Sequence, residues 1–159
     1  GLPILLSVLA AEIGARAGVC LAPVGMPGHF LVRDCADPDG FLDPFHGGRR
    51  LDRAACVELF RSLHPGAAFH EQYLDPIDSR SVLVRVVTNL VRSYTERGDL
   101  ASLAWALHLR ALLLGGDTWL HVARVRERLG DWAGAAGALE SHGSADAQAR
   151  AVSLRARSN

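Results

Sequence analysis

The sequence predicts an α+β fold in two parts, a small core over residues 1–75 and an α-helical tail over residues 76–159. Three observations predict it. An apolar run opens the chain, short apolar segments separated by turn residues follow, and a repeated Gly-Asp motif marks the second half. With 49% apolar and 21% charged residues, the 159-residue chain has enough apolar side chains to build a packed core.

The opening segment, residues 4–17, predicts a helix buried inside the core. Pro3 suits the first turn of a helix, where its missing N–H costs nothing. The helix is apolar on nearly every side, with Ser7, Glu12 and Arg16 as polar exceptions, and such a helix lies inside a domain. Glu12 and Arg16 also interrupt the run well short of a membrane span. Because the chain enters this helix almost at once, we expect a further segment upstream.

Short strands with turn residues between them are predicted after this helix, at residues 19–24, 29–33 and 41–43. The sequence ADPDG supplies the turn between the second and third strands. The sequence HGGRR, residues 46–50, predicts a loop. Asp52 is expected to cap a short helix that ends near Ser62.

The second half of the chain contains an internal repeat. ERGDLASLAWAL, Glu96–Leu107, recurs as RLGDWAGAAGAL, Arg128–Leu139, at an offset of 32 residues. This offset is close to the period of about 34 residues in tetratricopeptide repeats. Each Gly-Asp pair predicts a turn between two helices, with Asp99 or Asp131 as the N-cap of the second. Residues 144–157 predict a polar closing helix. A generic bundle of helical hairpins is the alternative.

His29 and Asp43 predict a hydrogen-bonded pair across a hairpin. They are 14 residues apart around a turn centred near Ala36, so in an even register they share one face, with Cβ atoms about 5 Å apart. A carboxylate in that place orients an imidazole, as in a catalytic triad. A one-residue slip would move the two to opposite faces. A satisfied core histidine and an ordinary strand-ending Asp-Pro are the structural alternatives.

Charge and cysteine usage narrow the classes of function. Lys+Arg and Asp+Glu both number 17, so nothing predicts a nucleic-acid or membrane partner. Cys20, Cys35 and Cys56 are an odd number at irregular spacing. This pattern predicts neither a disulfide framework nor a zinc signature, and it fits a reducing cytoplasm. All three cysteines are therefore interpreted as structural or incidental.

His46 stands close to His29 and Asp43 in the sequence. Two imidazoles and a carboxylate are possible ligands of a metal ion. Proximity in the sequence is the only support for such a site, so we expect neither a metal nor another cofactor.

Several motifs and their order resemble the SirB1 family of bacterial proteins. GLPILLSVL at the start, MPGHFLVR and FLDPFHGG in the hairpin, and the trailing repeats carry the resemblance. It implies a core similar to transglutaminases and papain-like enzymes, followed by tetratricopeptide-like repeats. In that superfamily a catalytic cysteine begins the central helix, whose N-terminus stabilises the thiolate.

The resemblance implies catalytic roles for His29 and Asp43, but the cysteine matches a position near Pro3 or Ile4, and neither is a nucleophile. Ser7 is a weak substitute because such a hydroxyl usually bonds a carbonyl of the preceding turn. We therefore expect a non-catalytic regulatory protein that binds a protein or peptide through its helical repeats. The alternative is an amide hydrolase or acyl-transfer enzyme with His29 as base, Asp43 as orienter and water or Ser7 as nucleophile.

Overall fold

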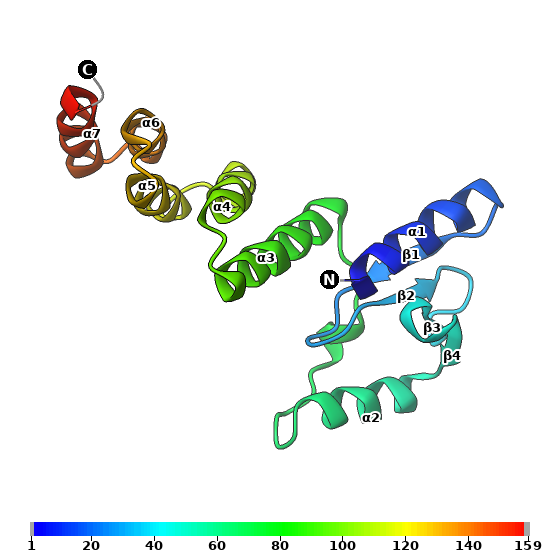
Figure 1. The fold of residues 1–159 in the computed structure, drawn as a ribbon. Coiled ribbons are helices and arrows are strands. Elements are labelled where there is room, and N and C mark those ends of the chain that lie inside the picture. Colours follow the sequence, from blue (N-terminus) through cyan, green and yellow to red (C-terminus); the bar gives the residue numbers. More distant parts are fainter. Residues whose placement is uncertain (1, 158–159) are drawn as a thin grey trace. The chain divides into compact units, whose positions relative to one another are not determined.

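The computed structural model describes residues 2–157, and the chain divides into two compact units, Gly1–Val82 and Leu83–Asn159 (Figure 1). The α-helices are α1 (Leu2–Arg16), α2 (Arg53–Leu63), α3 (Ser79–Arg97), α4 (Leu100–Leu114), α5 (Thr118–Arg128), α6 (Trp132–His142) and α7 (Ala145–Arg157). The strands are β1 (Leu21–Val24), β2 (Leu31–Asp34), β3 (Phe41–Asp43) and β4 (Arg49–Leu51), and two 3-10 helices are η1 (Pro44–His46) and η2 (Glu71–Leu74). The α+β fold with a helical tail is confirmed.

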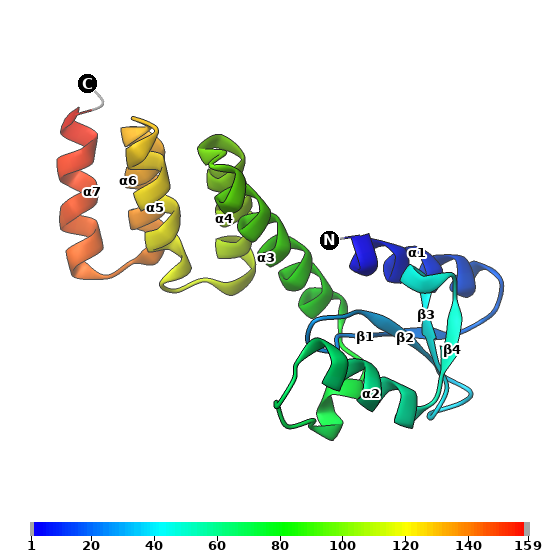
Figure 2. The same cartoon turned by 60° about the horizontal axis from the view of Figure 1, so that its bottom comes forward.

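The four strands form one antiparallel sheet in the order β1-β2-β3-β4. Helix α1 packs against β1 and β2, and α2 lies on the opposite side of the sheet (Figure 2). A cluster of buried side chains joins the strands to α2, namely Val24, Met26, Leu31, Phe41, Leu51, Cys56, Phe60 and Leu74. The N-cap predicted for α2 is present, because the Asp52 side chain accepts a hydrogen bond from the backbone N–H of Ala55 at 2.8 Å.

One strand was not expected from the sequence. Arg49–Leu51 forms β4, which pairs antiparallel with β3, so the loop predicted for residues 46–50 is wrong in its second half. Gly47 and Gly48 make the preceding turn with φ of 71° and 77°, values that favour glycine. Only Leu51 of the three strand residues is buried. The strand therefore has no apolar alternation by which the sequence could reveal it.

Helix α1 is less buried than its composition predicts. Ile4 and Ser7 are buried, and α1 contacts the sheet. In contrast, Leu5, Leu9 and Ile13 are 55%, 54% and 57% exposed. Because these three residues are four apart, they form one apolar stripe along the helix. The prediction of a helix buried on all sides is wrong, since the described part of the chain covers only some of its faces. No helix within residues 2–157 has the length and apolar character needed to cross a membrane.

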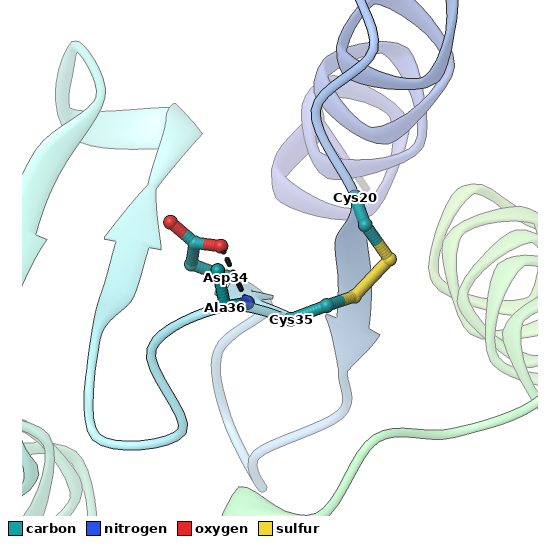
Figure 3. Close-up of a disulfide and its surroundings, with 4 residues drawn as sticks. All are labelled: Cys20, Asp34, Cys35 and Ala36. Carbon is teal, nitrogen blue, oxygen red and sulfur yellow. Dashed lines mark hydrogen bonds between the residues drawn. A yellow bond between two sulfur atoms is a disulfide. The ribbon is translucent and has the colours of Figure 1, made fainter.

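Cys20 and Cys35 form a disulfide at the open end of the β1–β2 hairpin (Figure 3). The register pairs Leu21 with Asp34, so the next residues outward face each other with Cα atoms 5.4 Å apart. The Cys35 N–H also donates to the Cys20 carbonyl at 3.0 Å. The prediction that the cysteines form no disulfide is wrong for this pair. It rested on the number and spacing of cysteines, whereas the strand register brings these two together.

The two Gly-Asp turns form in the helical unit as predicted. Gly98 and Gly130 have φ of 68° and 74°. Asp99 and Asp131 each accept a hydrogen bond from the backbone N–H three residues ahead, at 3.0 and 2.8 Å. Within this unit α4 packs on α5, α5 on α6 and α6 on α7 (Figure 2). The helical tail thus consists of successive antiparallel helices joined by short turns.

Candidate functional site

The hydrogen bond predicted between His29 and Asp43 is present. Nε2 of His29 lies 2.9 Å from Oδ2 of Asp43. His29 just precedes β2, and Asp43 ends β3. The register that pairs Val32 with Leu42 places the two side chains on one face, but diagonally rather than directly opposite. Both are buried, with 8% of His29 and 2% of Asp43 exposed.

Asp43 is the centre of a larger network. Its Oδ1 accepts hydrogen bonds from the backbone N–H groups of Phe45 and His46 at 3.1 and 3.2 Å, which caps η1. Its Oδ2 lies 2.7 Å from Nδ1 of His46. The rings of His29 and His46 stack with centroids 5.5 Å apart. One carboxylate oxygen is therefore shared by two imidazoles.

This network sets the charge of Asp43. Burial works to raise its pKa, but the hydrogen bonds from His46 and His29, together with the electrostatic effect of His29, outweigh burial. The pKa of Asp43 therefore lies below its ordinary value. Asp43 is ionised at neutral pH and can accept hydrogen bonds from both imidazoles.

The start of α1, where the resemblance predicts the superfamily's cysteine, carries no nucleophile at Pro3 or Ile4. Ile4 is 4% exposed. Ser7, one turn further along α1, is fully buried, and its hydroxyl donates to the carbonyl of Phe30 at 3.3 Å rather than to its own helix. A hydroxyl that is closed off from solvent and already bonded to the backbone does not meet a substrate. The placement of Ser7 thus weighs against its use as a nucleophile.

Cys56 in α2 is the free cysteine among the described residues, and it is fully buried. Burial, helped by the negative charges of Asp52 and Asp43, raises the pKa of its thiol to about 11. Because the thiolate is the reactive form, a thiol with this pKa is inert at neutral pH. Cys56 is therefore a structural core residue, in agreement with the sequence interpretation.

We expect the Cys56 thiol to be unreactive toward the thiol reagent DTNB while the protein is folded. The native protein should show no titratable thiol, the guanidinium-unfolded protein one, and the unfolded and reduced protein three. Absorbance at saturating DTNB measures this count. A thiol that reacts at full stoichiometry before unfolding would contradict the buried position of Cys56.

A second candidate site lies in the helical unit. Side chains from α3, α4 and α5 line a pocket of about 390 Å³. Arg110, Arg124, Arg128 and His121 contribute the basic groups, beside apolar side chains such as Leu107. No carboxylate is among the described residues that line it. The pocket is thus basic and partly apolar.

The three pocket arginines form no ion pair with an acidic side chain of the described residues, whereas several other arginines of the unit do. The arginine ion pairs of this unit include Arg92–Glu96, Arg126–Asp131, Arg150–Glu127 and Arg155–Glu140. No ion pair within residues 2–157 includes Arg110, Arg124 or Arg128. Nε of Arg110 is buried without a hydrogen-bond partner in the described part of the chain, and one Nη atom lies 3.5 Å from Nδ1 of His121.

These arginines were not predicted from the sequence as a site. His121, Arg124 and Arg128 are three and four residues apart, which puts them on one face of α5. This basic face of α5 was the feature of the sequence from which a binding site could have been predicted. Arg110 could not be added to it, because its place beside His121 depends on how α4 packs against α5.

A comparison of sequences establishes the family of the chain. A family profile described as the transglutaminase-like superfamily matches residues 1–88. This match covers more than half of the chain, so the chain belongs to the transglutaminase-like superfamily.

Similar proteins occur in bacteria and in animals. A UPF0162 protein of Xylella fastidiosa (strain Temecula1) is 43% identical over 110 residues, which cover 64% of this chain and 39% of the relative. A UPF0162 protein of Pseudomonas aeruginosa is 34% identical over 100 residues, covering 62% and 36%. F-box only protein 21 of Homo sapiens is 33% identical over 143 residues, covering 77% and 22%. The chain thus spans about two fifths of the UPF0162 proteins or less. No solved structure matches the chain.

Proposed function

We propose that the chain is a SirB1-type, non-catalytic module that binds an acidic segment of a partner protein or peptide. The arginine pocket of the helical unit is the observation that carries this proposal. The Gly-Asp turns and the offset of 32 residues between them support tetratricopeptide-like helix pairs in this unit. The low exposure of His29, at 8%, and the apolar nucleophile position support the absence of catalysis.

The charge of the pocket defines the ligand. Three guanidinium groups stand together without a carboxylate to neutralise them, and Nε of Arg110 has lost water without gaining an acceptor. A ligand carboxylate would accept short, charge-assisted hydrogen bonds from such groups, often two at a time. Because Leu103 and Leu107 also line the pocket, the preferred segment has an apolar residue next to Asp or Glu.

The same features favour a peptide over a nucleic acid. Binding to a phosphate backbone needs an extended positive surface. This chain carries 17 basic and 17 acidic residues, and the three arginines of the pocket lie within one cavity of about 390 Å³ rather than along an extended surface. We therefore propose neither a nucleic-acid nor a membrane partner.

Reversing the charge of the pocket is expected to abolish peptide binding. The probe is a fluorescein-labelled synthetic peptide that alternates Glu-Glu with Leu, and fluorescence anisotropy measures its Kd. The double variant Arg124→Glu, Arg128→Glu should weaken binding by at least tenfold, or about 1.4 kcal/mol, because attraction becomes repulsion. Binding to the wild type should also weaken as salt increases.

The matched control is Arg92→Glu, a charge reversal on α3 at an exposed arginine outside the pocket lining. It should leave the Kd for the acidic peptide within about twofold. A peptide in which Lys replaces every Glu should not bind the wild type. The proposal fails if the pocket variant binds the acidic peptide as tightly as Arg92→Glu does.

An amide hydrolase or acyl-transfer enzyme is the second candidate. The His29–Asp43 hydrogen bond of 2.9 Å favours it, since this is the contact of a base with its orienter. It requires water as nucleophile and an opening that exposes His29. Release of p-nitroaniline from an amide substrate, lost in His29→Gln, would establish this activity. Equal rates in wild type and variant would eliminate it.

A further inference from the structure

Three atoms of the kind that bind metals converge in the first unit. Nε2 of His29, Oδ2 of Asp43 and Nδ1 of His46 all lie within 4.8 Å of one another. The two contacts to the carboxylate oxygen are 2.9 Å from His29 and 2.7 Å from His46. The sequence offered only their proximity along the chain, whereas the fold points all three atoms at one place.

The ligand set suits a divalent transition-metal ion. Zn²⁺ binds imidazole nitrogen and carboxylate oxygen at about 2.0–2.2 Å, so neighbouring ligand atoms of a tetrahedral site stand about 3.3 Å apart. The two observed separations from Oδ2 are a few tenths of an ångström shorter. An ion can therefore enter if Oδ2 moves outward by a few tenths of an ångström and the two imidazole nitrogens, which lie within 4.8 Å of each other, turn toward the ion. The carboxylate and two neutral imidazoles also suit Zn²⁺, Co²⁺ or Ni²⁺ better than Mg²⁺ or Ca²⁺.

The surroundings hold the ligands in place. The backbone N–H groups of Phe45 and His46 bind Oδ1 of Asp43, which orients the carboxylate and leaves Oδ2 to face the imidazoles. Such outer contacts to a ligating carboxylate support metal sites in general. The side chain of His46 is 55% exposed, whereas those of His29 and Asp43 are 8% and 3% exposed. The site thus has two buried ligands and one exposed ligand at its solvent side.

We propose that His29, Asp43 and His46 bind one divalent transition-metal ion of the Zn²⁺ class. Water fills the remaining coordination positions. This site lies in the first unit and is independent of the peptide pocket, so either proposal can fail without the other. The competing arrangement is a cluster without metal, in which both imidazoles donate hydrogen bonds to Oδ2.

Titration of the full chain with Co²⁺ tests the site, because visible absorption reports the number and geometry of Co²⁺ ligands. Calorimetry with Zn²⁺ supplies the stoichiometry. The buffer contains no reductant, so that Cys20 and Cys35 stay in their disulfide and offer no thiolate. We expect one equivalent of each ion to bind to the wild type.

The test variant is His46→Ala, which removes an exposed ligand and leaves the buried His29–Asp43 contact in place. Metal affinity should fall at least tenfold, and circular dichroism should show an unchanged fold. His70→Ala, at an exposed histidine outside the cluster, should bind as the wild type does. The proposal is overturned if the wild type binds no ion, or if His46→Ala binds Co²⁺ with wild-type affinity and spectrum.

Discussion

Replacing Asp43 with alanine is expected to lower the free energy of unfolding by about 3–5 kcal/mol. The change removes the acceptor of two backbone N–H groups and of two imidazoles, and buried donors without a partner are costly. Asp43→Asn keeps the size and one acceptor oxygen, so its cost should be smaller, about 1–3 kcal/mol. Urea denaturation followed by far-UV circular dichroism measures both.

Hydrogen exchange shows which part of the chain loses stability in Asp43→Ala. All three tryptophans lie in the second unit, so tryptophan fluorescence monitors that unit, whereas exchange in residues 21–51 monitors the strands. Asp39→Asn, at an exposed turn residue, is the matched control and should change stability by less than about 0.5 kcal/mol. A similarly small loss in Asp43→Ala would mean that the network does not support the fold.

The pH dependence of this contribution has a definite sign. In the folded chain the pKa of Asp43 lies below its ordinary value of 3.8. Its charge therefore stabilises the fold above the unfolded-state pKa, and this contribution is lost as pH falls through the folded pKa. The advantage of the wild type over Asp43→Asn should shrink as the pH falls below about 4. Parallel stability curves from pH 2 to 4, measured in EDTA, would contradict this.

Removing the Cys20–Cys35 disulfide is expected to cost about 3 kcal/mol. The bond closes a loop between residues separated by 15 positions, and it restricts the unfolded chain more than the folded one. The double variant Cys20→Ser, Cys35→Ser should therefore unfold at lower urea than the wild type in non-reducing buffer.

Adding a reductant distinguishes the loss of the disulfide from any destabilisation that the serine side chains themselves cause. It should lower the stability of the wild type toward that of the double variant and leave the double variant unchanged. Equal midpoints of wild type and variant without reductant would show that the bond contributes nothing. A cytoplasmic protein would hold both cysteines as thiols, so alkylation during cell lysis tests the predicted location at the same time.

The sequence predicted the features that depend on local pattern. The short apolar segments between turn residues located β1 to β3, Asp52 predicted the cap of α2, and the Gly-Asp motif predicted the helix turns. The His29–Asp43 contact was also predictable, because side chains of even register on two paired strands share a face. In each case the deciding interaction is between residues close in sequence or joined by one hairpin.

The features that were missed depend on how separate elements meet. Strand β4 has two exposed arginines and is held by its pairing with β3. The exposure of Leu5, Leu9 and Ile13 on α1 depends on which other elements pack against the helix, and composition does not reveal this. The basic pocket needs α3, α4 and α5 packed together before Arg110 joins the arginines of α5.

The disulfide also has a consequence for mapping the molecule by mass. Trypsin can cut after Arg16, Arg33 and Arg49, which releases residues 17–33 with Cys20 and residues 34–49 with Cys35. Without reduction the disulfide keeps these two fragments together as one branched peptide. It carries His29 on one arm and both Asp43 and His46 on the other. Modification of any of the three side chains can therefore be read from a single mass peak.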